Sequence, residues 1–424
     1  TSITAGTGLS GGAITSSGTI AIDSTVATLT GTQTLTNKTL TSPVATGTVD
    51  INGNLDVDGG TIKLDGNYPV ATGNVALGDT ALSTISSAVN NTAIGFNALK
   101  NSNNDNNTAV GKDALCTNTS GSENTAVGVF ALRYNTTENN NTAIGREALE
   151  ANLAANNTAV GFQSMEDNTT GTSNVALGYS SLNKNTTADN NTAVGFSALN
   201  SNTTADDNTA VGKDSLKANT TGAKNTAVGV NALYSNTTGA SQVAVGCDSL
   251  CTNTTGLYNV GIGRQSLKSN TTASGNTAVG MQSLCKNTTG ASNTAVGCAA
   301  LLCNTTGSSN TALGTGSLDS TTTGVQNTGV GAAIMTGLTE GNHNTAVGAA
   351  SLRSVTTGGC NIAMGVCALR ENTGSCNTAL GTCSLFNNTT ASNNTAVGYN
   401  SLCKNTTGTY NTALGTLALD ANIT

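Results

Sequence analysis

The 424 residues carry a formal net charge of −7, with 9% charged side chains, 3% aromatic side chains and no Trp. Lys and Arg are sparse and scattered, so we expect no nucleic-acid binding, and without an apolar run of about 18 residues we expect no membrane insertion. So few bulky side chains cannot fill two or three globular cores. A chain of this composition is expected to fold only if its apolar residues recur at regular positions.

The first 73 residues lack the regular spacing that marks the rest of the chain. Stretches 6–12 and 32–43 are rich in Gly, Ser and Thr, and residues 49–58 alternate apolar with polar side chains. A Gly pair then precedes residues 61–64, a pattern typical of β-hairpins. We predict a small irregular β segment over residues 1–73, serving for attachment.

From residue 74 to residue 424 one unit repeats, Asn-Thr-Ala-Val-Gly-x-x-Ala/Ser-Leu-x-x-Asn-Thr-Thr-Gly-x-x. Its first Gly recurs from Gly78 to Gly415 at intervals of 16 or 17 residues. Thr, Asn and Gly dominate each unit, and no apolar spacing of i, i+3, i+7 extends beyond one turn, so a helix is excluded. The sequence predicts an all-β fold, a β-roll-like β-solenoid of about 21 coils.

Two large apolar residues per unit are the predicted core, one directly before the Gly and one four residues after it. We expect two short strands per coil, each directing one of these side chains inward, with the Gly at a bend or a close backbone approach. The predicted core therefore includes Val110, Leu115, Val194, Leu199, Val211, Leu216, Val228 and Leu233.

A single coil is not expected to be stable without the coils stacked on it. Burying one Val and one Leu contributes roughly 1.5–3 kcal/mol each, whereas fixing the backbone costs roughly 1–2 kcal/mol per residue. Stacked coils share backbone ladders, and aligned Asn side chains can bond from rung to rung. The core is thin and a row of Ala and Ser follows each Gly by three residues, so we expect three identical chains to pack around one axis.

Residues 4–43, with Ala-Gly-Thr-Gly-Leu-Ser-Gly-Gly at 5–12 and the segment 32–43, resemble tail-fibre and structural proteins of tailed phages, especially myoviruses of marine cyanobacteria. The Asn-Thr-Ala-Val-Gly repeats look like those of fibre proteins that often end in a self-cleaving chaperone. The Ala-Val-Gly-x-x-Ala/Ser core is similar to the head repeats of trimeric autotransporter adhesins, which form left-handed β-rolls in homotrimers. The adhesin repeat is shorter than 16 residues, so its handedness does not carry over.

These resemblances imply a structural shaft at a virion surface or outside the cell, holding a tip that binds a host glycan or receptor. An extracellular filament or adhesin subunit of a microbe is an alternative, and the Thr rows leave an ice-binding solenoid as a second one. Paired carboxylates or a nucleophile constellation would mark an enzyme, and the sequence has neither, so we expect no catalysis, cofactor or metal.

Some residues suggest more specific roles. Phe162, Tyr179 and Phe196 follow the Gly in three consecutive coils, a strip that could contact a glycan or pack between chains. Cys360 and Cys376 are one coil apart, as are Cys367 and Cys383, so disulfides and free thiols both remain open. The only histidine, His343, is expected in a surface loop. The Asn-x-Thr sequons could carry glycans, or the ladder itself could demand them.

Overall fold

The computed structural model describes residues 9–10, 21–22 and 72–423. The chain divides into two units, Thr1–Lys63 and Leu64–Thr424. In the first unit, β1 (Leu9–Ser10) and β2 (Ala21–Ile22) pair antiparallel, with Leu9 opposite Ile22. The hairpin predicted over residues 49–64 lies outside the described residues.

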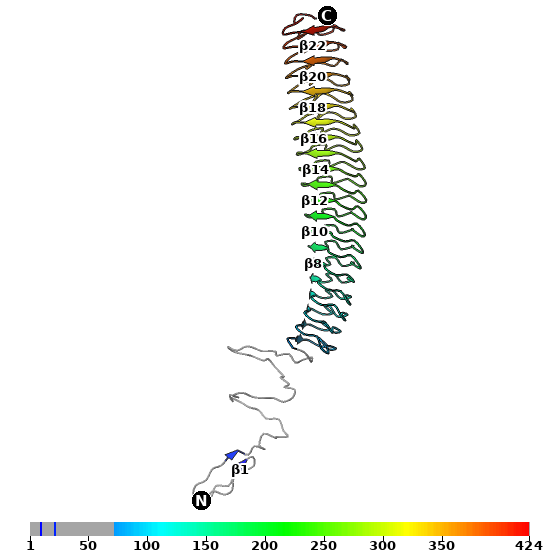
Figure 1. Cartoon of the computed structure of the whole chain (residues 1–424), viewed down its shortest axis with the longest axis vertical. Helices are drawn as coiled ribbons and strands as arrows, with labels where there is room; N and C mark the ends of the chain where they lie inside the picture. Colours follow the sequence, from blue (N-terminus) through cyan, green and yellow to red (C-terminus); the bar gives the residue numbers. More distant parts are fainter. Residues whose placement is uncertain (1–8, 11–20, 23–71, 424) are drawn as a thin grey trace. The chain divides into compact units, whose positions relative to one another are not determined.

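The second unit is a β-solenoid whose coils stack into a column, and the first of its strands begins one residue after the predicted start of the repeat (Figure 1). The strands are β3 (Val75–Leu77), β4 (Thr92–Ile94), β5 (Thr108–Val110), β6 (Thr125–Val127), β7 (Thr142–Ile144), β8 (Thr158–Val160), β9 (Val175–Leu177), β10 (Thr192–Val194), β11 (Thr209–Val211), β12 (Thr226–Val228), β13 (Val243–Val245), β14 (Val260–Ile262), β15 (Thr277–Val279), β16 (Thr294–Val296), β17 (Thr311–Leu313), β18 (Thr328–Val330), β19 (Thr345–Val347), β20 (Ile362–Met364), β21 (Thr378–Leu380), β22 (Thr395–Val397) and β23 (Thr412–Leu414).

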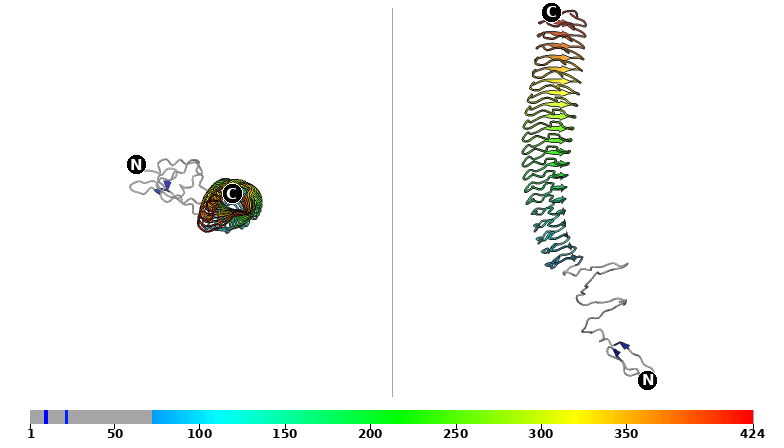
Figure 2. Two further views of the ribbon diagram at one scale, coloured as in Figure 1. Left: turned by 90° about the horizontal axis from the view of Figure 1, so that it is seen from above. Right: turned by 180° about the vertical axis from the view of Figure 1, so that it is seen from behind.

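Each strand pairs in parallel with the equivalent strand of the next coil, without any slip in register. Val194 pairs with Val211, and Val211 pairs with Val228, as the repeat length predicts. Seen from above, the coils therefore overlie one another (Figure 2). The predicted solenoid and its 16- or 17-residue rung are confirmed.

Each described coil of the solenoid contains one strand, so the expectation of two strands per coil is wrong. The Ala/Ser-Leu segment is a turn, because residues two and four after the Gly adopt left-handed backbone angles that a strand excludes; Leu199 has a φ of 49°. Its amide still donates to Ser215 O in the next coil at 3.0 Å. The coils thus remain hydrogen-bonded at this corner without a second strand.

The interior of the coil holds mainly Ala and Leu, and the Val directly before the repeated Gly is not part of it. Leu115, Leu199, Leu216 and Leu233 are fully buried, which confirms that half of the predicted core, and Ala193 at the centre of β10 is also fully buried.

The prediction is wrong for Val110, Val194, Val211 and Val228, which are half-buried or exposed. The cause is the alternation of side chains along a strand: the central Ala faces inward, so the flanking Thr and Val must face outward. The narrow coil accepts only small groups at the inward position. The Ala and Ser that follow the Gly by three residues are buried as well, as Ala198 and Ser215 are, so this row cannot be the expected contact between chains.

The repeated Gly is required by both its backbone angle and its surroundings. Gly195 has a φ of +137°, and a Cβ placed there would lie 2.6 Å from the carbonyl oxygen of Gly212. Any side chain at this position would therefore collide with the backbone of the next coil, which confirms the predicted close approach.

Two buried Asn ladders hold the column together, as the sequence predicts. In most coils the residue four before the Gly is Asn, and its side chain accepts the backbone amide of its counterpart one coil on, so that Asn208 N donates to Asn191 Oδ1 at 3.0 Å. The Asn seven residues after the Gly bonds through its side chain, and Asn219 Nδ2 donates to Asn202 Oδ1 at 2.9 Å. Wherever Asn follows Asn, the ladder side chains are thereby paired from rung to rung.

Candidate functional site

The most extensive candidate interaction surface is a column of apolar side chains on the outer face of the sheet. We call it the apolar stripe: the residue directly before the repeated Gly in each coil, from Leu77 to Leu414. It contains 21 residues, all Val, Ile, Leu or Met, and none of them is buried. Val211, Val228 and Val245 in three successive coils are each 36% exposed. An uninterrupted apolar row of this length is unusual on the surface of a monomeric protein.

A Thr column runs beside the apolar stripe. Thr192, Thr209 and Thr226 pair in register, three residues before the Gly of each coil, and are half-buried. The Thr column eight residues after the Gly differs, because its hydroxyls donate to the next coil; Thr220 Oγ1 bonds Thr237 O at 3.0 Å. The outer sheet face is thus a regular array of Thr and apolar side chains.

Phe162, Tyr179 and Phe196 form a stack, as their spacing suggests. Successive ring centroids are 5.2 Å apart, with interplanar angles of 11° and 8°. The guanidinium of Arg146 lies 5.7 Å from the ring centroid of Phe162 at the end of the stack. Because the rings cover one another's faces, they present mainly edges outward, whereas a sugar packs best on an open face.

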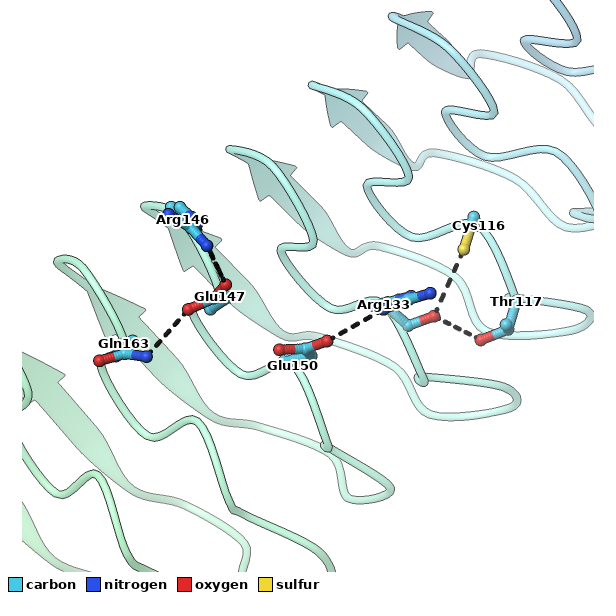
Figure 3. A network of polar contacts seen from close by, with 7 residues as sticks. All are labelled: Cys116, Thr117, Arg133, Arg146, Glu147, Glu150 and Gln163. Carbon is cyan, nitrogen blue, oxygen red and sulfur yellow. Dashed lines mark hydrogen bonds and ion pairs between the residues drawn. The ribbon is translucent and has the colours of Figure 1, made fainter.

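Charged side chains near this stack pair with one another, both within a coil and between neighbouring coils (Figure 3). Arg146 Nη2 lies 2.7 Å from Glu147 Oε1, and Gln163 Nε2 donates to Glu147 Oε2 at 2.9 Å. Arg133 Nη1 lies 3.3 Å from Glu150 Oε1, yet partial burial keeps the pKa of Glu150 above its usual value. The Arg133–Glu150 and Gln163–Glu147 contacts thus connect neighbouring coils, whereas Arg146 and Glu147 pair within one coil.

A surface hollow of about 340 Å³ is lined by Asp214, Asn231, Tyr234 and Cys251. Lys217 Nζ lies 2.9 Å from Asp214 Oδ1, so the acidic group is already paired. Partial burial raises the pKa of the Cys251 thiol, and the nearby Asp248 raises it further.

The predicted cysteine and histidine positions lie on the surface. Over residues 72–423 all eleven cysteines are free thiols, including Cys360, Cys376, Cys367 and Cys383. His343 is exposed, as expected of a loop residue. Within the described part of the chain no three His, Cys, Asp or Glu side chains gather as metal ligands would, and no helix there is long and apolar enough to cross a membrane.

The sequon asparagines belong to the buried ladder. Asn135, Asn185, Asn219, Asn236, Asn253, Asn287 and Asn405 are all fully buried. Asn236 Nδ2, the atom that a glycan would occupy, donates to Asn219 Oδ1 at 2.8 Å and to Gly239 O at 2.8 Å. The Asn-Thr-Thr sequence therefore serves the fold in the folded protein.

Sequence alone could have located the apolar stripe. Strict alternation around the small central Ala is the signal for it, whereas the size of the Val alone favours the interior. No known protein family, curated protein or solved structure matches this chain.

Proposed function

We propose that this chain is the shaft of a structural fibre, a homotrimer that carries a host-recognition tip on a virion of the tail-fibre type. The observation that carries the proposal is the apolar stripe, which continues through every coil from β3 to β23 on the outer face of the sheet. A rod whose one continuous apolar surface follows its long axis is suited to lateral packing against copies of itself.

The size of the apolar stripe supports self-association. Twelve of its 21 residues are at least 36% exposed and the other nine are half-buried, which amounts to on the order of 1,000 Å² per chain, compared with roughly 800 Å² per partner in a standard stable interface. Identical chains in parallel would place each apolar stripe against its neighbours along the whole rod. The number three comes from the resemblance of the repeat to trimeric adhesin heads, and closed cyclic symmetry would bury every copy equally.

The virion assignment rests on the resemblance of residues 4–43 to phage fibre proteins. The alternative of a microbial extracellular filament or adhesin subunit shares the same rod, and it differs in the particle or cell surface on which the chain occurs. Mass spectrometry of purified virions and of host surface fractions separates the two, because a shaft protein of a virion must be present in intact particles.

Solution mass tests the self-association. Sedimentation of the full chain should give about three times the protomer mass of 41.8 kDa. Val211→Asp, Val228→Asp and Val245→Asp combined should shift this mass to that of the protomer while the β-sheet circular dichroism stays unchanged. The matched control combines Thr204→Asp, Thr221→Asp and Thr238→Asp, three exposed positions in successive coils outside the apolar stripe. A monomeric wild type, or a trimer that survives the Val substitutions, would overturn the proposal.

Ice binding is the second candidate, favoured by the in-register Thr column of the outer sheet face. A flat array of Thr and Val methyl groups repeated at one rung spacing is the surface that such a function needs. Measurable thermal hysteresis in the wild type, lost in Thr192→Tyr, Thr209→Tyr and Thr226→Tyr combined, would favour ice binding over the fibre.

A further inference from the structure

Two pairs of cysteines lie on the same two neighbouring coils. Cys360 and Cys367 flank β20, the first two residues before it and the second three residues after it. Cys376 and Cys383 flank β21 at the same distances along the chain. The pair Cys360 and Cys376 therefore lies at one end of the ladder that joins these strands, and the pair Cys367 and Cys383 lies at the other end.

Backbone hydrogen bonds place the members of each pair directly over one another. The amide of Cys376 donates to the carbonyl of Gly359, the residue before Cys360, at 3.0 Å. The amide of Cys383 donates in the same way to the carbonyl of Val366, the residue before Cys367, also at 3.0 Å.

All four cysteines have φ angles between 57° and 59°, so the members of each pair share the same left-handed backbone conformation. Rungs about 4.8 Å apart bring the Cα atoms of each pair within the roughly 4.4–6.8 Å that a disulfide accepts.

The thiols are accessible to a reagent in solution. Cys360 and Cys376 are exposed, and Cys367 and Cys383 are half-buried. Burial raises the pKa of Cys383, and the neighbouring Cys367 raises it further, which agrees with their close approach.

Other cysteines of the solenoid do not all stack in this way. Cys303 lies over Lys286, whose Nζ is 3.6 Å from the cysteine Sγ, and not over Cys285. Stacking of two cysteine pairs on one pair of coils is thus a feature of the particular positions around β20 and β21.

We propose that Cys360–Cys376 and Cys367–Cys383 are redox-controlled cross-links that join the β20 and β21 coils at both ends of their shared ladder. The oxidant is a small-molecule disulfide such as oxidised glutathione. The thiolate of one cysteine attacks the reagent's S–S bond, forming a mixed disulfide and releasing one glutathione thiolate. The stacked cysteine then attacks the sulfur of its partner and releases the second glutathione thiolate. The two thiol protons pass to the two glutathione molecules, and each cross-link consumes one oxidant.

The cross-links would act at one interface of the column. Coils in a solenoid are held mainly by their nearest neighbours, so each interface between coils can open locally. Joining β20 to β21 covalently would restrain opening at their interface under oxidising conditions. This inference does not depend on the fibre proposal, because both cross-links lie within one chain.

Peptide mapping of the full chain tests the pairing. Trypsin releases residues 354–370, with Cys360 and Cys367, and residues 371–404, with Cys376, Cys383 and Cys403. After treatment with oxidised glutathione the two peptides should be joined, and only Cys403 among these five should be alkylated. In the Cys376→Ser variant Cys360 should become alkylated while Cys367 stays cross-linked. The matched control, Cys403→Ser, should retain both cross-links.

Hydrogen exchange tests the consequence. Amides of Thr378–Leu380 should exchange at least tenfold more slowly in the oxidised chain, and a reductant should reverse the change. The variant with both Cys376→Ser and Cys383→Ser should show no difference between the two conditions. The proposal is overturned if Cys360 and Cys367 remain fully alkylated after oxidation, if the only cross-links join separate chains, or if oxidation leaves the exchange unchanged.

Discussion

Asn219 donates its side-chain amide to Oδ1 of Asn202, one coil earlier, at 2.9 Å, and both side chains are fully buried. Oδ1 of Asn219 in turn accepts Nδ2 of Asn236 from the following coil at 2.8 Å. One carboxamide thus serves both neighbouring rungs, which explains why Asn recurs at this position.

Asn219→Ala should destabilise the column locally, because it leaves buried polar atoms of Asn202 and Asn236 unpaired. Each such group costs about 1–3 kcal/mol. Hydrogen exchange should therefore accelerate in β11 and β12. Thr221→Ala, an exposed position in the same coil, should leave exchange unchanged. Equal exchange in the two variants would contradict a structural role for the ladder.

Thr321→Asn should stabilise the protein. The Asn ladder is interrupted where Thr321 follows Asn304, and among the described residues Asn304 Oδ1 and Thr321 Oγ1 are buried without a hydrogen-bond partner. An Asn at 321 could donate to Asn304 Oδ1, which is worth about 1 kcal/mol. Slower exchange in β17 and β18 is the expected result. Thr321→Val, which adds no donor, serves as the control and should give no comparable gain.

Gly195→Ala should be severely destabilising, by about 3 kcal/mol or more, since the new Cβ would meet the Gly212 backbone and adopt an unfavourable φ. Gly275 has a φ of +70°, and a Cβ added there would lie no closer than 3.7 Å to any neighbouring atom. Asn190 holds the equivalent place in another coil with a φ of 60°. Gly275→Asn should therefore stay within about 0.5 kcal/mol of the wild type in denaturant unfolding. Comparable losses in both variants would count against the close approach.

Leu233→Asp should disrupt one part of the column and spare the rest. The fully buried Leu233 would be replaced by a charge without a partner, a change that costs more than about 4 kcal/mol. Because coils contact only their neighbours, hydrogen exchange should rise in β12 and β13 and remain slow in β4 and β22. Leu233→Met, which preserves apolar volume, should behave as the wild type. Loss of all β-signal from the Asp variant would refute independent coils.

Glu138 should make stability depend on acid pH. Partial burial raises the pKa of its carboxyl, but the hydroxyl of Thr137 and the amides of Thr136 and Thr137 donate to it and bring the pKa below its ordinary value of 4.5. The folded state therefore binds the proton less readily than the unfolded state. The stabilisation is present above pH 4.5 and is lost as the pH falls through the folded pKa.

Glu138→Gln should therefore lower the melting midpoint at pH 7 and converge with the wild type in acid. Thr137→Ala, which removes one donor and keeps the two amides, should give a smaller difference at pH 7. A gap between wild type and Glu138→Gln that does not change with pH would exclude this linkage.

Part of the candidate sites could be predicted from the sequence, and part required the structure. The spacing of Phe162, Tyr179 and Phe196 was enough to predict that they align, since residues one coil apart must overlie one another. It could not reveal that the rings face each other at 5.2 Å and so cover the surfaces that a sugar would need. Likewise, sequons such as Asn236 can be found in any sequence, but only the fold shows that the amide nitrogen is already committed to Asn219 and Gly239.

The sequence by itself determined the solenoid, its rung length, the place of Gly195 and its equivalents, and the Asn ladders, because a fixed repeat leaves only one register in which like residues stack. Only the tertiary structure decided which side of each strand faces inward. The larger side-chain volume of Val194 favours it as the core residue, whereas the narrow coil has room only for Ala193 and Val194 faces outward. The left-handed backbone of Leu199, which is found where a second strand was expected, could not be predicted from the local sequence either. Such a φ angle is unfavourable for an isolated Leu, and it persists here because the side chain is packed in the buried interior.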